Sequence, residues 1–161
     1  MKTLFILRHA KSSWKNSDLA DFNRPLNPRG LEDATFMGAL IYQNKFQPDV
    51  ILSSPAKRAK QTAILVKETA QLEKTIQYEE KIYEASPLTL IEIISRLEYE
   101  QESAFLIGHN PGLENLIKFL TGEALILPTA GFARIALQID SWSGISADCG
   151  QLELFASPIL K

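Results

Sequence analysis

Three apolar stretches of the sequence end in side chains that could bind or attack an anion. Arg8 and His9 follow "TLFIL", Arg58 comes soon after "VILSSP", and His109 follows "AFLIG". Arginine offers forked donors for an anion, and an imidazole is a general base or nucleophile near neutral pH. The chain has two histidines, and both follow an apolar run at equivalent positions, a coincidence that packing does not require. We therefore predict that these four side chains converge on one anion-binding crevice.

Each of these residues has a simpler reading when it is taken alone. Arg58 belongs to an Ala-rich helical stretch that also carries Lys57 and Lys60, so it could be a solvated surface residue. A histidine after an apolar strand could be a hydrogen-bonded loop residue. The combination of the two histidines and two arginines at strand ends favours the shared crevice.

The elements that must position these side chains alternate along the chain. Apolar runs bounded by polar or turn residues predict strands at Thr3–Leu7, Val50–Leu52 and Ala104–Ile107. Apolar residues at helical spacing predict helices over 28–44, 55–72, 87–97 and 111–120. Pro28 suits the first turn of the first helix, and Ser54, Ser86 and Asn110 are the predicted caps of the other three.

This alternation predicts an α/β fold. Uninterrupted apolar strands separated by helices are typical of a mainly parallel sheet with helices on both faces, a three-layer sandwich. After Gly122 the segments "FARIALQID" and "QLELFA" alternate apolar and polar residues, which predicts a C-terminal antiparallel hairpin. In such sheets ligands collect beyond the carboxyl ends of the strands, where helix N-termini favour an anion. We expect a single domain over residues 1–161.

Composition excludes several classes of protein. The chain is 45% hydrophobic and 22% charged, with a formal net charge of −2, so neither disorder nor nucleic-acid binding is expected. The single Cys149 allows no internal disulfide and suits a reducing compartment. No apolar run has the length of a membrane span, and we expect a cytoplasmic protein. One cysteine and two separated histidines predict no metal site.

The blocks "LRHA", "SSPAKRAKQTA" and "IGHNPGLE" together resemble the signature of the histidine phosphatase superfamily, which has the phosphoglycerate mutase-like fold. "RHAKSSW", "RPLNPRG" and the short length resemble the SixA-type phosphohistidine phosphatases. Ala10 stands where the family more often has glycine, as is typical of the SixA-like branch. Lys11 and Lys15 stand where the mutase branch has an acidic residue and asparagine, which weakens the mutase interpretation.

The resemblance implies a mechanism without metal or other cofactor. His9 would attack phosphorus and become a phosphohistidine that water hydrolyses, while Arg8, Arg58 and His109 hold the phosphoryl oxygens. Glu84 in "KIYEASP" is the candidate proton donor, although it could equally be a solvated residue near a helix start. Lys11 could add positive potential near the phosphate or face water, and we favour the former.

The implied function is a phosphatase that acts on phosphohistidine in a protein. A small-molecule phosphatase or mutase, acting on a sugar or acid phosphate, is the alternative, and a non-catalytic module that binds phosphorylated ligands is a second. Partners would be a phosphorylated protein or a small phosphorylated metabolite, with no nucleic acid and no membrane.

The segment from Lys11 to Asn27 carries further charges. In "DFNRPLNPRG", Asp21, Arg24 and Arg29 could line the mouth of the site and meet a protein substrate. We favour the interpretation that these charges are solvated while the two prolines organise a turn. The two tryptophans, Trp14 and Trp142, are expected to be packing groups, because no basic stripe accompanies them.

Overall fold

A six-stranded sheet forms the centre of the computed structural model, which describes residues 1–158. The strands are β1 (Lys2–Arg8), β2 (Val50–Ser53), β3 (Ile76–Tyr78), β4 (Ser103–Gly108), β5 (Phe132–Leu137) and β6 (Gly150–Ala156). Their order is β3-β2-β4-β1-β5-β6. The first four strands run parallel, while β5 is antiparallel to β1 and β6 is antiparallel to β5. The predicted mainly parallel sheet with a C-terminal hairpin is confirmed.

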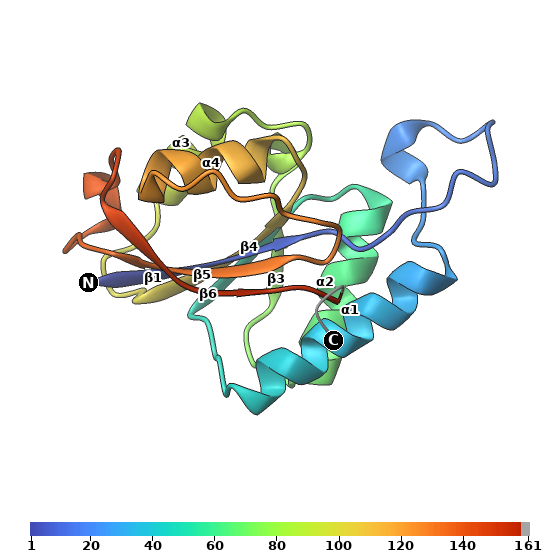
Figure 1. The fold of residues 1–161 in the computed structure, drawn as a ribbon, viewed down its shortest axis with the longest axis horizontal. Helices are drawn as coiled ribbons and strands as arrows, with labels where there is room; N and C mark the ends of the chain where they lie inside the picture. The colour runs from blue at the N-terminus through green and yellow to red at the C-terminus, as the bar shows by residue number, and fades with distance from the viewer. Residues whose placement is uncertain (159–161) are drawn as a thin grey trace.

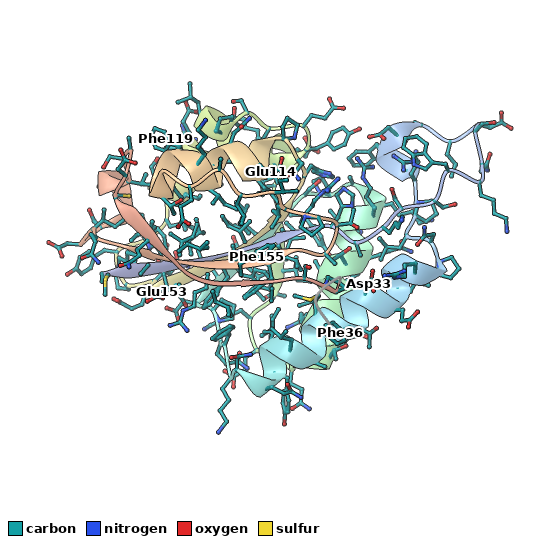
Figure 2. All side chains as sticks on the ribbon, in the orientation of Figure 1. Asp33, Phe36, Glu114, Phe119, Glu153 and Phe155 are labelled. Atoms are coloured by element: carbon teal, nitrogen blue, oxygen red, sulfur yellow. The ribbon has the colours of Figure 1, made fainter. Side chains whose placement is uncertain are left out.

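Four helices form the outer layers (Figure 1). They are α1 (Pro28–Gln43), α2 (Lys57–Ala70), α3 (Pro87–Ser95) and α4 (Gly112–Thr121). Helices α1 and α2 cover one face of the sheet, and α3 and α4 cover the other. Figure 2 shows Phe36 of α1 and Phe119 of α4 on opposite sides of the strands. The three-layer prediction is therefore confirmed, and among residues 1–158 no helix is both long and apolar enough to cross a membrane.

The central strand β1 explains why its sequence is an unbroken apolar run. Leu4 and Ile6 belong to the core on the α3 and α4 side, whereas Phe5 and Leu7 belong to the core on the α1 and α2 side. Alternate side chains of a strand point to opposite faces, so a strand covered on both faces needs apolar residues at every position. The buried run ends at Leu7, so Arg8, the last residue of β1, lies at the carboxyl edge of the sheet.

The register of the parallel strands brings the two histidines to one level of the sheet. Arg8 of β1 pairs with Gly108 of the neighbouring β4. His9 and His109 therefore follow two adjacent parallel strands at equivalent positions, and the neighbouring strand β2 ends at Ser53, which pairs with Ile107. The carboxyl ends of three strands thus meet at one edge, as the sequence predicts.

The helix starts follow the predicted pattern in part. Pro28 begins α1 and Ser86 caps α3 by accepting a hydrogen bond from the amide of Thr89. The Ser54 prediction is wrong, because α2 begins two residues later than expected, at Lys57, with Ala56 as its cap.

The predicted cap of α4 is displaced by one residue. The cap position is Pro111, although the side chain of Asn110 does accept a hydrogen bond from the amide of Glu114. The edge strand β3 was not predicted: it has three residues, of which Gln77 and Tyr78 are exposed, and so it lacks the apolar run of the inner strands.

Candidate active site

His9 and His109 face each other at the carboxyl edge of the sheet. Their ring centroids lie 5.1 Å apart, and only 7% of His9 and 9% of His109 is exposed. Both line a pocket of about 580 Å³ that Arg8, Lys11 and Arg58 also line. The structure therefore brings together, from segments a hundred positions apart in the sequence, the side chains for which we predicted a shared crevice.

The hydrogen bond of His9 to its own loop determines which ring nitrogen is reactive. Nδ1 lies 2.7 Å from the carbonyl oxygen of Ala10, and because a carbonyl only accepts, Nδ1 carries the proton. The neutral ring then presents a lone pair on Nε2. Burial, together with the positive charges of the pocket, lowers the pKa of His9 to about 3, so the ring is neutral at physiological pH.

A threonine of α2 links the loop that follows His9 to the backbone of Arg58. The amide of Ala10 donates to Oγ1 of Thr62 at 3.0 Å, and the same hydroxyl donates to the carbonyl oxygen of Arg58 at 2.7 Å. Thr62 is fully buried. This bridge sets the separation between the His9 loop and the first turn of α2, on which Arg58 lies.

Ser54 orients His109. Its Oγ lies 2.8 Å from Nε2 of His109 and accepts a hydrogen bond from the amide of Ala56 at 3.2 Å. Because the hydroxyl is fully buried and its proton needs an acceptor, we assign the hydroxyl as the donor to Nε2, which leaves the proton of the neutral ring on Nδ1. Burial lowers the pKa of His109 to about 4, and Arg58 adds to this effect.

Two buried donors of the pocket lack a protein partner. Within residues 1–158, Nε of Arg8 and Nδ1 of His109 are buried and make no hydrogen bond. The other end of the Arg8 guanidinium donates to the carbonyl oxygen of Leu127 at 3.1 Å, a segment held in turn by Asn110 and Glu114. Leaving a buried donor unsatisfied costs free energy, and an anion bound in the pocket would offer acceptors to such donors.

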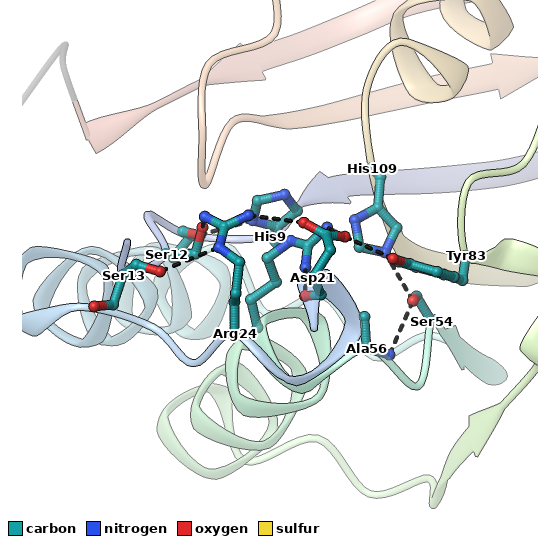
Figure 3. Close-up of polar contacts among 11 residues, drawn as sticks. His9, Ser12, Ser13, Asp21, Arg24, Ser54, Ala56, Tyr83 and His109 are labelled. Carbon is teal, nitrogen blue, oxygen red and sulfur yellow. Dashed lines mark hydrogen bonds and ion pairs between the residues drawn. The ribbon is translucent and has the colours of Figure 1, made fainter. Parts of the chain in front are cut away.

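Arg58 is paired with Asp21 of the Lys11–Asn27 segment. Figure 3 shows Asp21 between Arg24 and Tyr83. The two terminal nitrogens of Arg58 donate to the backbone oxygen of Asp21 at 2.8 Å and to Oδ2 at 3.0 Å. The hydroxyl of Tyr83 donates to the same Oδ2 at 2.6 Å, and Arg24 donates to Oδ1 at 2.9 Å. The hydrogen bond from Tyr83, aided by those from Arg24 and Arg58, holds the pKa of Asp21 well below its usual range.

The prediction that the charges of this segment are solvated is wrong for Arg24, whereas Asp21 and Arg29 are exposed. Arg24 is buried, donates to the backbone oxygen of Ser13 and to Oγ of Ser12, and lines the pocket. Asp21, although exposed, makes the contacts just described. Arg29 forms an ion pair with Asp33 at 3.2 Å, away from the pocket.

The two tryptophans differ. Trp142 is fully buried, so the packing prediction is confirmed for it. That prediction is wrong for Trp14, which is 78% exposed and lines the mouth of the pocket. The guanidinium carbon of Arg24 lies 3.2 Å from the centroid of its ring, so a buried charge, rather than the apolar core, holds Trp14.

Glu84 and Lys11 occupy different positions relative to the histidines. Lys11 is exposed and lines the main pocket. Glu84 is also exposed, has a positive φ of 54°, and lines a neighbouring pocket of about 540 Å³ that shares His109 and Asn110 with the main one. Glu84 thus lines the neighbouring pocket rather than the main one, and among residues 1–158 no hydrogen bond or ion pair joins it to His9.

The sequence analysis did not identify Ser54 and Tyr83 as site residues, because their roles depend on contacts with His109 and Asp21. Ser54 was read as a helix cap because it precedes Pro55, and its distance from His109 in the sequence hides the contact. Tyr83 carried no signal, since its role depends on Asp21 and on ring contacts with His109 and Phe22. Among residues 1–158 there is no group of three or more His, Cys, Asp or Glu that could hold a metal ion.

Comparisons with known proteins agree with this geometry. A family model described as "Histidine phosphatase superfamily (branch 1)" matches residues 4–104. An uncharacterized protein of Mycobacterium tuberculosis is 31% identical over 163 residues, which cover 94% of this chain and 99% of that protein. A crystal structure from Agrobacterium tumefaciens, provisionally described as the phosphohistidine phosphatase SixA, is 30% identical, with a TM-score of 0.83 over 98% of both chains. The protein histidine phosphatase SixA complexed with tungstate shares the fold, with a TM-score of 0.85 over 99% of both chains at 24% identity.

Proposed function

This chain belongs to the histidine phosphatase superfamily, and from that premise we propose that it is a phosphatase whose His9 accepts a phosphoryl group from phosphohistidine in a protein. The observation that carries the proposal is the arrangement of the two imidazoles. The rings lie 5.1 Å apart in a pocket that Arg8, Arg24 and Arg58 also line, with a lone pair on Nε2 of His9 and a donor on Nδ1 of His109. One ring can attack phosphorus while the other binds a phosphoryl oxygen.

The proposed reaction has two displacements. Nε2 of His9 attacks phosphorus in line, the bond from phosphorus to the leaving imidazole breaks, and that imidazole takes up a proton. Water then attacks phosphorus, the bond to Nε2 breaks, and inorganic phosphate leaves with release of a proton. The phosphorylated ring is positively charged with its proton on Nδ1, and the carbonyl oxygen of Ala10, 2.7 Å away, stabilises that charge.

The chain's own cations supply the charge stabilisation. Arg8, Arg58 and His109 offer donors to the phosphoryl oxygens. Within residues 1–158, Nε of Arg8 and Nδ1 of His109 have no other hydrogen-bond partner. Phosphoryl transfer depends mainly on positioning and on such stabilisation of charge. We therefore propose that the reaction needs no metal, with Lys11 adding positive potential at the pocket mouth.

Phosphohistidine as the substrate is supported by the leaving-group side of the site. A leaving imidazole needs less help from an acid than a leaving alkoxide, and Glu84, the candidate donor, is exposed and lines the neighbouring pocket. The exposed Trp14 and Lys15 also line the main pocket, where they would meet the surface of a protein that presents the phosphorylated side chain. The likeness to the Agrobacterium chain points the same way.

The test is activity and trapping with purified protein in EDTA. We expect slow hydrolysis of p-nitrophenyl phosphate and faster hydrolysis of a phosphohistidine protein, with acid-labile phosphate on His9 after rapid quenching. His9→Ala should abolish both. Arg8→Ala and Arg58→Ala should each lower the rate by about a hundredfold, whereas Lys57→Ala, an exposed cation beside Arg58, should have no effect. Full turnover by the His9 variant would remove His9 as the nucleophile.

Two further measurements separate the alternatives. Rates on a phosphohistidine protein, a phosphoserine peptide and 3-phosphoglycerate distinguish a protein phosphatase from a small-molecule phosphatase or mutase. If 3-phosphoglycerate is preferred by orders of magnitude, the protein-substrate proposal fails. A non-catalytic binding module would bind phosphate but never carry it covalently. Glu84→Gln should slow the phosphoserine reaction far more than the phosphohistidine reaction.

A further inference from the structure

A carboxylate of the chain itself, that of Asp21, is hydrogen-bonded to Arg58, the arginine proposed to bind the phosphoryl group. Both terminal nitrogens of Arg58 donate to Asp21, one to its backbone oxygen and one to Oδ2. Carboxylate and phosphate oxygens use the same forked donors of a guanidinium. A phosphoryl group that binds Arg58 must therefore share these donors with Asp21 or displace it.

Asp21 is held at this position by groups other than Arg58. Tyr83 donates to Oδ2 and Arg24 to Oδ1. Tyr83 itself packs edge-on against the His109 ring, with centroids 5.5 Å apart. The negative charge of Asp21 thus lies at the edge of the phosphoryl site, and two partners keep it there even when Arg58 turns to a ligand.

The segment that carries Asp21 is closed at its base. Ser12 and Leu26 form an antiparallel bridge, and the amide of Ser13 donates to the backbone oxygen of Pro25 at 2.8 Å. The side chain of Asp21 remains 45% exposed, and its hydrogen bonds to Arg58, which lines the pocket, put its carboxylate beside the proposed phosphoryl site. The low pKa of Asp21 is consistent with a permanent negative charge at this place.

We infer that Asp21 is a specificity-determining residue, an internal anion at Arg58 that disfavours ligands in proportion to their negative charge. This inference rests on the proposed function, because it assumes that the phosphoryl group binds Arg58. A phosphoryl group on a neutral remainder such as imidazole meets the smallest repulsion, whereas 3-phosphoglycerate brings an additional carboxylate to the same site. Inorganic phosphate, the product, is likewise bound more weakly than the pocket cations alone would bind it.

The size of the effect follows from the charges. Removing one unit charge a few ångströms from a dianion, in surroundings partly open to water, changes the affinity by about tenfold. Asp21→Asn removes this charge and keeps an amide oxygen that can accept from Arg58 and Tyr83. The backbone bond from Arg58 to residue 21 is unaffected by the substitution.

The experiment measures the dissociation constant of inorganic phosphate by calorimetry on four proteins. They are the unchanged chain, Asp21→Asn, Arg58→Ala and the control Asp18→Asn, which removes the same charge from an exposed residue of the same segment. We expect about tenfold tighter binding by Asp21→Asn, no change for Asp18→Asn and strong weakening for Arg58→Ala. With turnover, kcat/KM should rise more for 3-phosphoglycerate than for p-nitrophenyl phosphate in Asp21→Asn.

The outcomes distinguish the inference from the proposed function. Equal or weaker phosphate binding by Asp21→Asn, with Arg58→Ala still impaired, would overturn the role of Asp21 and leave the phosphatase proposal standing. If Arg58→Ala binds phosphate as tightly as the unchanged chain does, the proposed phosphoryl site is wrong. If Asp21→Asn fails to fold, Tyr83→Phe removes only the hydroxyl that holds Oδ2, and it should tighten phosphate binding a few-fold; unchanged affinity would count against the inference.

Discussion

The stability of the protein should fall between pH 7.5 and pH 5.0 because of its two active-site histidines. Burial lowers the pKa of His9 to about 3 and that of His109 to about 4, whereas both rings titrate near 6.5 in the unfolded chain. Below pH 6.5 the unfolded chain therefore takes up protons that the folded chain does not. The free energy of unfolding is highest above pH 6.5 and falls as the pH drops toward the folded-state values.

The magnitude can be worked out for each ring. A pH of 5.0 lies about 1.5 units below the unfolded pKa, which corresponds to about 2 kcal/mol for one histidine and about 4 kcal/mol for both. The chain has two histidines, so no other histidine contributes. The carboxyl group of Asp21, whose pKa is lowered, loses its contribution only below about pH 4. A loss of this size is a large part of the stability of an ordinary domain.

The assay is urea unfolding followed by circular dichroism at pH 7.5, 6.5 and 5.0. The double variant His9→Gln, His109→Gln is the control, and its free energy of unfolding should change by less than about 1 kcal/mol over this range. A wild-type curve equally flat would refute the reasoning, since it would mean that both rings titrate in the folded chain as they do in water. His9 would then be largely protonated below pH 6.5 and unable to attack phosphorus.

Two substitutions test the elements that support the site. Ser54→Ala removes the hydroxyl that orients His109, so kcat should fall about tenfold and the free energy of unfolding by about 1–3 kcal/mol. The control Ser53→Ala removes a hydroxyl that donates to the backbone carbonyl of Ser54 and should leave kcat unchanged. Normal kcat in Ser54→Ala would exclude an orienting role. Gly30→Ala would bring a Cβ to within 2.1 Å of the Lys11 carbonyl oxygen, so Tm should fall by about 6 °C, or about 2 kcal/mol. In the control Gly144→Ala, the atoms nearest to the added Cβ are 3.8 Å away, so its Tm should equal that of the unchanged chain. If both variants have the same Tm, the close approach of Gly30 to the Lys11 carbonyl is contradicted.

The arrangement of the core strands and of the two histidines could be predicted from the sequence. Strands buried on both faces leave an unbroken apolar run such as "TLFIL", and parallel neighbours bring their carboxyl ends to one edge by geometry alone. The helix of Pro28 and the cap of Ser86 are local signals that the structure retains. These predictions depend on residues near one another in the sequence or on the topology of the sheet.

The parts that could not be predicted depend on contacts between distant segments. Asp21 looks like a solvated loop charge until Tyr83 and Arg58 are packed beside it, and a sequence does not show a contact that spans 62 positions. Ser54 has the type and place of a helix cap, yet its hydroxyl bonds His109 instead. In both cases a tertiary hydrogen bond outweighed the local preference.

Because β1 lies in the middle of the sheet, the residues next to His9 should be less mobile than the segment that carries Asp21. Because β4 and β5 pair with it on both edges, the amides next to the nucleophile should exchange with deuterium only when the whole domain opens. The segment with Asp21, by contrast, is largely exposed and is held to the rest of the site by the hydrogen bonds of Asp21, so it should open locally at a smaller cost than the sheet. As the temperature rises, the selectivity among ligands that we attribute to Asp21 should therefore be lost before the position of His9 is disturbed.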